Sequence, residues 1–391
     1  MEKVKIIDFC NISNGFAFKS DKYISENGAR VIRITNVQKG KIVDNDPKLY
    51  PFSELDKLEA YKIFEGDILM SLTGNVGRVG RFPKELLPAY INQRVCRVMP
   101  KNEKLDTNFL FHFLNSDVFE NEAIKNSAGA AQLNLSTKWL GDFEIPLPNL
   151  ATQQRIAAIL DQADAIIQNN RAIVQKYDAL TQSLFLDMFG DPVKNEKGWE
   201  IRKMEEISLK ITDGTHQSPK FLKEGIPFLL VSNIVNNKIN YKTNKFISEE
   251  DFETLNKRTP IEIGNILLTS VGSYGNPAII ESQMKFAFQR HIAFIKPNHS
   301  MINYHFLFHF LKSDLIKREI DKKVKGAAQK TYNLVELKKL RIILPTITLQ
   351  NKFAERVSAI EAQKQKAQLE LAKSEELFQS LLQKAFKGEL S

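Results

Sequence analysis

Polar side chains that can form paired hydrogen bonds gather in short segments that follow apolar runs. The segments form three matched pairs: 73–78 with 270–276, 92–94 with 289–291, and 14–19 with 212–216. An Asn or Gln amide can pair with adenine and an Arg guanidinium with guanine, and glycine lets a backbone approach closely. The same residue types also cap turns, so a structural role stays open for each of them. The candidate contacts to bases and phosphates are Lys19, Arg33, Thr73, Asn75, Arg78, Asn92, Gln93, Arg94, Thr215, His216, Ser218, Lys220, Ser270, Ser273, Tyr274, Asn276, Gln289, Arg290 and His291.

Catalytic motifs are missing from the sequence. It contains neither Asn-Pro-Pro-Tyr nor Asp-Pro-Pro-Tyr, which hold the target amine in amino-methyltransferases, and no Phe-x-Gly-x-Gly turn or Walker loop. His305 and His309 stand four residues apart, as zinc ligands can, but the first copy has Asn108 in place of His305. Glu336-Leu337-Lys338 resembles the tail of a nuclease motif whose second acid cannot be placed. We therefore expect no catalytic residue, no metal and no cofactor in this chain.

The sequence repeats itself at an almost constant offset. Phe-Leu-Phe-His-Phe-Leu at 109–114 returns at 306–311, and Gly-Ala-Ala-Gln at 129–132 returns at 326–329. Ile-Pro-Leu-Pro at 145–148 becomes Ile-Ile-Leu-Pro at 342–345. One offset across these blocks predicts two copies of one folding unit, which present two similar surfaces to a partner with two similar sites.

Size and composition are those of an ordinary globular protein. At 391 residues the chain exceeds the size at which one core keeps growing, so more than one domain is expected. Cys10 and Cys96 are too few for a disulfide framework. No apolar stretch approaches the roughly 18 residues that span a bilayer, and the N-terminus lacks the apolar segment of a signal peptide. We expect a cytoplasmic protein.

The net charge of +9 is unevenly distributed. Residues 1–197 hold 25 basic and 25 acidic residues, so the remaining 30 basic and 21 acidic residues carry the whole excess. A pI near 9.2 fits a polyanionic partner such as nucleic acid, although composition alone is weak support. The lysine-rich run 317–325 is typical of a solvated face that could hold phosphates.

Each copy begins with a mixed α/β segment. The runs 31–34, 67–71, 228–231 and 265–269 are typical of strands, and 107–115 and 303–312 carry apolar residues at helical spacing. The fold class we predict is α+β, with two similar globular domains separated by two long antiparallel helices. The predicted boundaries are 1–150 and 190–347 for the domains, the second with its linker, and 151–189 and 348–391 for the helices.

A period of 3.5 residues runs through both predicted long helices, and such a period is typical of a coiled-coil seam. Asn170, Thr181, Lys364 and Ser374 are its polar exceptions. The simplest arrangement buries the two stripes against each other, which relates the domains by an approximate two-fold axis. Two helices that each lie on their own domain are the alternative. The predicted core of the helix pair is Ile156, Leu160, Ile167, Val174, Tyr177, Leu184, Phe353, Val357, Ile360, Leu371, Phe378 and Leu381.

These residues resemble the specificity subunits of Type I restriction–modification systems over essentially the whole chain. The resemblance rests on four blocks, most of which occur twice in the same order. They are Gly-Asp-Ile-Leu at 66–69 with its glycine-rich loop, Asn-Gln-Arg at 92–94, Thr-Asp-Gly-Thr-His at 212–216 with Gly-Ile-Pro-Phe at 225–228, and Ile-Pro-Leu-Pro at 145–148 leading into Gln-Gln-Arg-Ile at 153–156. One departure is Gln-Asn-Lys-Phe at 350–353, which replaces Gln-Gln-Arg-Ile in the second copy and makes unequal docking at the two helices an expectation.

The resemblance implies a non-enzymatic DNA-binding subunit with two target-recognition domains. Each domain would read one half of a split double-stranded DNA target, and the helix pair would set the unread gap. The implied partners are two methylation subunits, which use S-adenosylmethionine to methylate adenine, and restriction subunits that translocate and cut. Two alternatives stay open at this point: a self-contained DNA-modifying enzyme with degenerate catalytic motifs, and a coiled-coil scaffold that binds only proteins.

Overall fold

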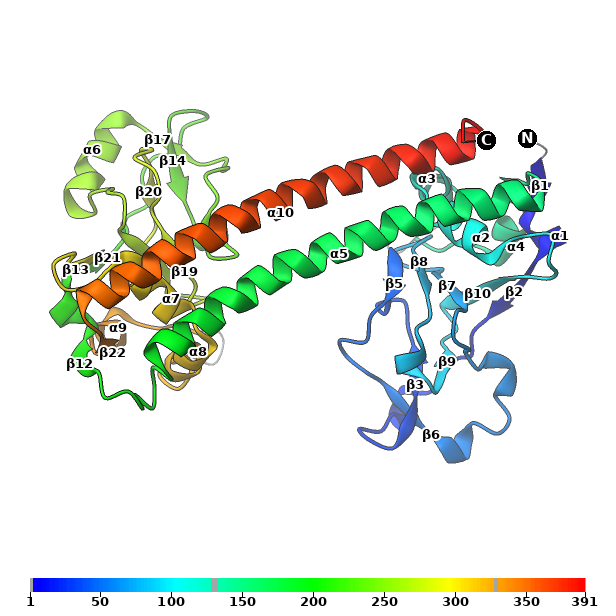
Figure 1. Ribbon diagram of the computed structural model, residues 1–391, viewed down its shortest axis with the longest axis horizontal. Helices are drawn as coiled ribbons and strands as arrows, with labels where there is room; N and C mark the ends of the chain where they lie inside the picture. Colours follow the sequence, from blue (N-terminus) through cyan, green and yellow to red (C-terminus); the bar gives the residue numbers. More distant parts are fainter. Residues whose placement is uncertain (1–2, 128–132, 327–329, 391) are drawn as a thin grey trace. The chain divides into compact units, whose positions relative to one another are not determined.

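The computed structural model describes residues 3–127, 133–326 and 330–390, and its elements repeat along the chain as the sequence does (Figure 1). Except for Gly326, the repeated Gly-Ala-Ala-Gln segments lie outside the described residues. The chain divides into two compact units, a first unit of Met1–Arg171 with Leu369–Ser391 and a second unit of Ala172–Gln368. Each unit therefore contains part of both long helices, α5 (Leu150–Phe189) and α10 (Ile347–Lys387).

Among the described residues, the first unit is built on three sheets. The six-stranded sheet has the order β2 (Cys10–Asn14), β10 (Val95–Pro100), β7 (Ile68–Ser71), β8 (Val79–Arg81), β5 (Gly40–Ile42) and β4 (Val37–Gln38). The second sheet has the order β6 (Leu49–Pro51), β3 (Gly28–Ile32), β9 (Ala89–Ile91), and β1 (Lys3–Lys5) pairs with β11 (Glu144–Pro146). The short helices are α1 (Ile6–Phe9), α2 (Thr107–Leu114), α3 (Asp117–Lys125) and α4 (Thr137–Asp142).

The second unit repeats this plan. Its four-stranded sheet has the order β13 (Ser208–Asp213), β21 (Ile292–Pro297), β18 (Ile266–Thr269), β19 (Pro277–Ile279), and its three-stranded sheet the order β17 (Phe246–Ile247), β14 (Ile226–Leu229), β20 (Ala287–Phe288). Two smaller pairs are β12 (Glu200–Lys203) with β22 (Arg341–Leu344) and β15 (Ile234–Val235) with β16 (Lys238–Ile239). The helices are α6 (Glu249–Arg258), α7 (Tyr304–Lys312), α8 (Asp314–Asp321) and α9 (Leu334–Lys338). The predicted strands and short helices are confirmed, with ends shifted by a few residues.

The central strands are apolar on both faces because both faces are covered. In β7, Ile68 and Met70 join the core that contains α2 and α3, whereas Leu69 joins the core shared with the β3 sheet. In β18, Ile266 and Leu268 likewise belong to one hydrophobic core and Leu267 belongs to another. A continuous apolar run is the pattern expected of such a doubly covered strand.

The long helices pack against each other in an antiparallel direction within each unit. The first unit joins the beginning of α5 to the end of α10, and the second unit joins the end of α5 to the beginning of α10. Three of the four polar exceptions of the heptad pattern, Asn170, Ser374 and Lys364, form polar contacts between the helices there. Asn170 Nδ2 donates to Ser374 Oγ at 2.9 Å in the first unit, and Lys364 Nζ lies 2.7 Å from Asp178 Oδ1 in the second.

All twelve residues of the predicted helix-pair core are buried or half-buried. Several of them also complete the cores of the globular parts, so both arrangements considered from the sequence apply together. Ile156 and Leu160 of α5 and Phe378 of α10 pack into the first unit's core, and Phe353 and Val357 of α10 into the second's. The sequence prediction missed the aromatic ends of this packing. These are Phe386, which lies 5.0 Å from the Phe113 ring, and Phe189, which lies 4.7 Å from the Phe306 ring.

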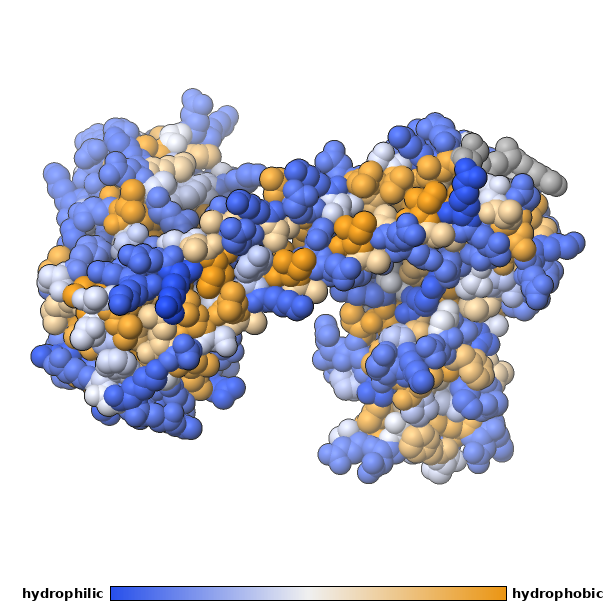
Figure 2. All heavy atoms as spheres, in the orientation of Figure 1, coloured by the Kyte–Doolittle hydropathy of each residue, from blue (hydrophilic) through white to orange (hydrophobic). Residues whose placement is uncertain are grey.

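Apolar side chains are also exposed along both long helices (Figure 2). The five most exposed comprise three on α5, which stand at heptad spacing and are 42–52% exposed, and two leucines on α10, which are 56–57% exposed. They are Ile166, Ile173, Leu180, Leu369 and Leu377.

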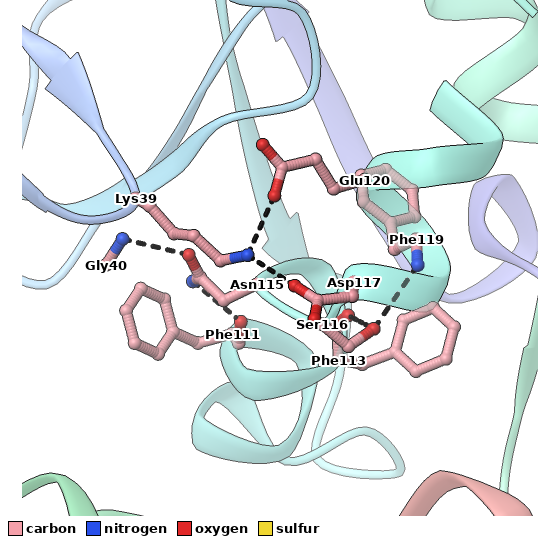
Figure 3. A network of polar contacts seen from close by, with 9 residues as sticks. All are labelled: Lys39, Gly40, Phe111, Phe113, Asn115, Ser116, Asp117, Phe119 and Glu120. Carbon is pink, nitrogen blue, oxygen red and sulfur yellow. Dashed lines mark hydrogen bonds and ion pairs between the residues drawn. The ribbon is translucent and has the colours of Figure 1, made fainter. Parts of the chain in front are cut away.

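In the first unit the β4–β5 hairpin is fastened to α2 and α3 by polar contacts (Figure 3). Lys39 Nζ lies 2.6 Å from Asp117 Oδ1 and 2.8 Å from Glu120 Oε2. The Gly40 amide donates to Asn115 Oδ1 at 2.9 Å. Burial opposes the charge of Lys39, but the hydrogen bonds to the two carboxylates raise its pKa above the ordinary value.

Candidate nucleic-acid interface

Three segments of the first unit meet through backbone hydrogen bonds. The segment after β2 bonds to the turn between β9 and β10, since Phe16 N donates to Ile91 O at 2.9 Å and Gln93 N donates to Phe16 O at 2.8 Å. The same turn bonds to the end of β7, where Leu72 N donates to Arg94 O at 2.9 Å. The polar segments that the sequence analysis singled out, 14–19, 73–78 and 92–94, therefore form one cluster of loops.

The second unit contains the same cluster with the same bonds. Thr215 N donates to Phe288 O at 3.0 Å, and Arg290 N donates to Thr215 O at 3.0 Å. Ser270 N donates to His291 O at 2.9 Å. The segments 212–216, 270–276 and 289–291 are thus held together as their counterparts are, and we call each set a loop cluster.

Gly15 and Gly214 make the close approach in each loop cluster possible. A Cβ at Gly15 would lie 2.1 Å from Asn92 O, and one at Gly214 would lie 2.1 Å from Phe288 O. Both contacts are with backbone, which no side-chain movement relieves. These two positions accept only glycine.

The loops after β7 and β18 are tight turns with glycines in the left-handed region. Their φ angles are 74° and 77° at Gly74 and Gly77, and 72° and 76° at Gly272 and Gly275. A hydroxyl at the end of each strand, from Ser71 or Thr269, donates to a backbone carbonyl within the turn. The turns leave Asn75 and Ser273 exposed at their tips.

The candidate residues differ in how available they are. Thr73 is buried and donates to Asn134 Oδ1 at 2.9 Å, and Ser270 is also buried. Arg78 donates to Gln38 Oε1 at 2.7 Å, and Arg33 forms an ion pair with Asp46 at 3.1 Å. Asn92, Thr215, Tyr274, Asn276, Gln289 and His291 are half-buried, and Lys19, Asn75, Gln93, Arg94, His216, Ser218, Lys220, Ser273 and Arg290 are exposed.

Two side chains of the second loop cluster, Tyr274 and His291, have shifted pKa values. A hydrogen bond with Asp321 raises the pKa of Tyr274, and Lys317 Nζ lies 3.8 Å from the centre of the Tyr274 ring. Burial, with a smaller contribution from the Arg290 charge, lowers the pKa of His291. Both effects favour the neutral form of the His291 ring, in which one nitrogen donates and the other accepts.

One side chain near the second loop cluster was missed by the sequence prediction. Arg258, the last residue of α6, places Nη2 2.5 Å from Asp213 Oδ1, and the other Asp213 oxygen lies 2.9 Å from His216 Nε2. No local signal marks Arg258, because in the first unit two short 3-10 helices, Phe52–Glu54 and Glu59–Tyr61, stand in place of the α-helix α6.

Other polar residues that repeat between the units serve the fold. Gln153 Nε2 donates to Lys104 O and Pro148 O, and its Oε1 accepts from the Asp106 amide. Gln350 makes the same contacts with Met301 O, Pro345 O and the Asn303 amide. The first glutamine of the block that resembled a docking motif is thus structural in both copies.

Within the described ranges, no group of three or more His, Cys, Asp and Glu side chains could hold a metal ion. Burial, aided by the nearby charge of Lys312, lowers the pKa of His309 to about 3. Burial raises the pKa of the Cys10 and Cys96 thiols to about 12. In the part of the chain that is described, every helix is too short or too polar to cross a membrane.

Comparisons with known proteins converge on one family. A family model described as Type I restriction modification DNA specificity domain matches residues 1–176 and 196–371. The specificity subunit of the Type I restriction enzyme EcoBI from Escherichia coli is 27% identical over 423 residues, covering 100% of this chain and 86% of that protein.

Solved structures agree on the fold. The S subunit of a Type I restriction–modification system from M. genitalium aligns with a TM-score of 0.55 and 17% identity over 98% of this chain and 96% of that chain. A second structure, which bears on complex assembly and conformational transition of the type I R–M system, aligns with a TM-score of 0.57 and 17% identity over 98% and 97%. At this identity the likeness establishes the fold alone.

Proposed function

This chain belongs to the Type I restriction–modification DNA specificity family, and we propose that each of its two loop clusters reads one half of a bipartite DNA target. The observation that carries the proposal is the pair of loop clusters, which share their backbone bonds but differ in side chains. A common backbone with exchanged side chains suits two readers that dock alike on DNA and recognise different bases.

Within each loop cluster, we assign base reading first to three of the exposed residues. Asn75, Gln93 and Arg94 would act in the first cluster, and His216, Ser273 and Arg290 in the second. The half-buried candidates come next. Thr73, Arg33 and Ser270 rank last because their contacts or burial hold them within the protein.

The long helices act in this proposal as a spacer between the half-targets. At about 1.5 Å per residue, α5 with its 40 residues is about 60 Å long. Half-sites about one duplex turn apart, ~34 Å, face the same side of DNA, so a stiff helix pair would select that separation. The polar pairs Asn170–Ser374 and Asp178–Lys364 support a fixed register between the helices.

The proposed partners are double-stranded DNA, two methylation subunits and restriction subunits that translocate and cut. As a specificity subunit the chain supplies target recognition, and the catalytic activities reside in the other subunits. The exposed apolar residues of α5 and α10, Ile166, Ile173, Leu180, Leu369 and Leu377, offer surfaces for docking. A cytoplasmic location stays a prediction.

Mapping methylated adenines in a host genome that expresses the complete system tests the proposal. We expect a split motif with an unread gap of fixed length. Replacing residues 1–150 with the corresponding domain of a relative should change one half of the motif and leave the other half as it was. Changes in both halves would refute independent reading.

Inserting one heptad into α5 and the matching heptad into α10 tests the spacer. We expect a longer unread gap or loss of methylation, with both half-motifs unaltered where methylation survives. An unchanged gap in such a variant would remove the helix pair from the recognition mechanism.

A further inference from the structure

A cluster of three charged or polar side chains lies at the edge of the second loop cluster. Asp213 ends β13, and its side chain is 14% exposed. One of its carboxylate oxygens contacts Arg258 at 2.5 Å and the other contacts His216 at 2.9 Å. Arg258 and His216 are 49% and 55% exposed, so a nearly buried acid holds two exposed side chains side by side.

The helix that carries Arg258 is firmly attached. Figure 1 shows α6 beside β14, β17 and β20, and Phe252 of α6 is buried in the core that Phe228, Ile247 and Ala287 share. Lys285 forms an ion pair with Glu249 in the first turn of α6. At its other end, Thr259 is buried and donates to Leu255 O at 3.3 Å. The backbone of Arg258 is therefore fixed before any ligand arrives.

The contacts of Arg258 leave part of its guanidinium free to bond elsewhere. Nε and Nη2 approach Thr212 Oγ1 at 3.4 and 3.2 Å, and Nη2 also bonds to Asp213. These contacts do not involve Nη1. A guanidinium has five N–H donors; those of Nε and Nη2 are engaged with Thr212 and Asp213, so the two N–H groups of Nη1 can still bond two acceptors. Guanine presents two such acceptors, O6 and N7, in the major groove.

The first unit has a different surface at the corresponding place. There the loop after β2 carries Phe16 and Ala17 where the second carries Thr215 and His216. The Phe16 ring packs against the Tyr61 ring, with their centres 5.3 Å apart. The second copy thus has charged side chains held by Asp213 at this place, whereas the first copy has an aromatic pair. Such a difference suits two half-targets of different base composition.

Resting on the proposed function, we propose that Arg258 reads a guanine in the half-target of the second domain and that Asp213 is the positioning residue that orients Arg258 and His216. The two Nη1 N–H groups of Arg258 supply the donors to guanine O6 and N7. His216, held by the same carboxylate, contacts the adjacent base or phosphate. The guanine preference is a property of the second half-target alone.

The test uses the full chain assembled with its methylation subunits and a set of target duplexes. Each base of both half-targets is replaced in turn, and the initial rate of adenine methylation is measured. We expect the parent complex to prefer guanine at one position of the second half-target by about 10- to 100-fold, the range of a bidentate contact. Arg258→Ala should reduce this preference to within about 3-fold, while the preferences in the first half-target stay unchanged.

Three further variants separate reading from structural support. Arg258→Lys keeps the charge but loses the planar guanidinium that Thr212 and Asp213 orient, so it should retain most of the overall rate and still lose the guanine preference. Lys257→Ala removes the neighbouring exposed cation on α6 and should leave all preferences intact. Asp213→Asn should relax the preference at the guanine and at the adjacent position together. Trp199 fluorescence during urea unfolding verifies that each variant is folded.

Two outcomes overturn the inference while leaving the proposed function in place. One is an Arg258→Ala complex with the parent's base preferences, and the other is a uniform fall in rate on every duplex without any change of preference. A parent complex that methylates without a split motif overturns the proposed function, and the inference falls with it.

Discussion

The β4–β5 hairpin of the first unit and the β15–β16 hairpin of the second unit are held in different ways. In the first unit Lys39 bridges Asp117 and Glu120, and Gly40 bonds to Asn115. In the second unit the sequence places Asn236 where the first has Lys39, Lys312 where it has Asn115, and Lys317 where it has Glu120. A pocket of about 750 Å³ lies between this second hairpin, α7, α8 and the long helices, and its counterpart in the first unit measures about 500 Å³. The backbone of the hairpin is repeated in the second unit, but the charged side chains that hold it in the first unit are replaced there.

His112, which is buried, and its counterpart His309, which is half-buried, differ in the same respect. His112 Nε2 lies 2.7 Å from Asp161 Oδ1, whereas Ser358 takes the place of Asp161 in the second copy. Burial lowers the pKa of His112, and the Asp161 hydrogen bond opposes that shift. Burial also lowers the pKa of His309, to about 3, and the Lys312 charge adds to the effect. The comparison shows that backbone bonds define the common fold, while side-chain electrostatics make each unit individual.

The glycines of the loop clusters give the largest expected effect and test the shared backbone. We expect Gly15→Ala and Gly214→Ala each to lower the free energy of unfolding of its own unit by about 3 kcal/mol or more, because the new Cβ meets a carbonyl oxygen. Urea unfolding followed by Trp139 in the first unit and by Trp199 in the second, each with the other tryptophan replaced by Phe, separates the two effects. Gly272→Ala, where a Cβ would meet nothing within 4 Å, is the control and should cost about 1 kcal/mol from its φ of +72°. Equal shifts of both tryptophans with either variant would show that the units do not unfold separately.

The buried glutamines test whether the helix starts are equivalent despite their different sequences. Gln153→Ala and Gln350→Ala each leave two backbone carbonyls and one amide without their amide partner, at an expected cost of about 2–3 kcal/mol. Gln154→Ala is the matched control, because Gln154 is the exposed neighbour on α5. Urea midpoints of the three variants provide the measurement. A cost with Gln153→Ala but none with Gln350→Ala would mean that the second copy has lost this support.

The repeat made the elements of the fold predictable, because strands and helices depend on local apolar patterns. The runs that became β7 and β18 and the heptads of α5 and α10 were identified from their spacing alone. The helix-pair core was predicted from periodicity, yet part of it packs into the globular cores, which depends on contacts far apart in sequence.

The loop clusters were predictable as segments but not as surfaces. Thr73 and Asn75 stand two residues apart in one polar loop, and only the contact of Thr73 with Asn134 decides which of them is buried. Arg258 meets Asp213 across 45 residues, and no periodicity connects them. Gln153 and Gln350 did carry a signal, their common offset, but it was interpreted as part of a docking block.

The two histidines test the electrostatic difference through pH. In the unfolded chain a histidine has a pKa near 6.5, so the unfolded state takes up a proton before folded His309 does. Stability is therefore lost as pH falls from about 6.5 towards 3, and we expect the second unit to lose on the order of 1–2 kcal/mol between pH 7 and pH 5. His309→Gln should flatten this dependence when Trp199 is followed. His112→Gln should flatten the first unit's dependence less, since the Asp161 hydrogen bond opposes the shift in the pKa of His112; an equal effect would contradict the comparison.

The hairpin fastening gives the smallest expected effect and tests the comparison most directly. Lys39 and its partners are between 23% and 54% exposed, so their ion pairs should contribute only about 0.5–1 kcal/mol. We expect Lys39→Ala to lower the unfolding free energy of the first unit by that amount, and Asn236→Ala at the matching position to leave the second unit within about 0.3 kcal/mol of the parent. A double-mutant cycle of Lys39→Ala with Glu120→Gln isolates the pair from other losses, and its coupling energy should shrink in 1 M salt, where charges are screened within about 3 Å. A coupling energy that stays the same in high salt would assign the fastening to packing of the lysine stem rather than to its charge.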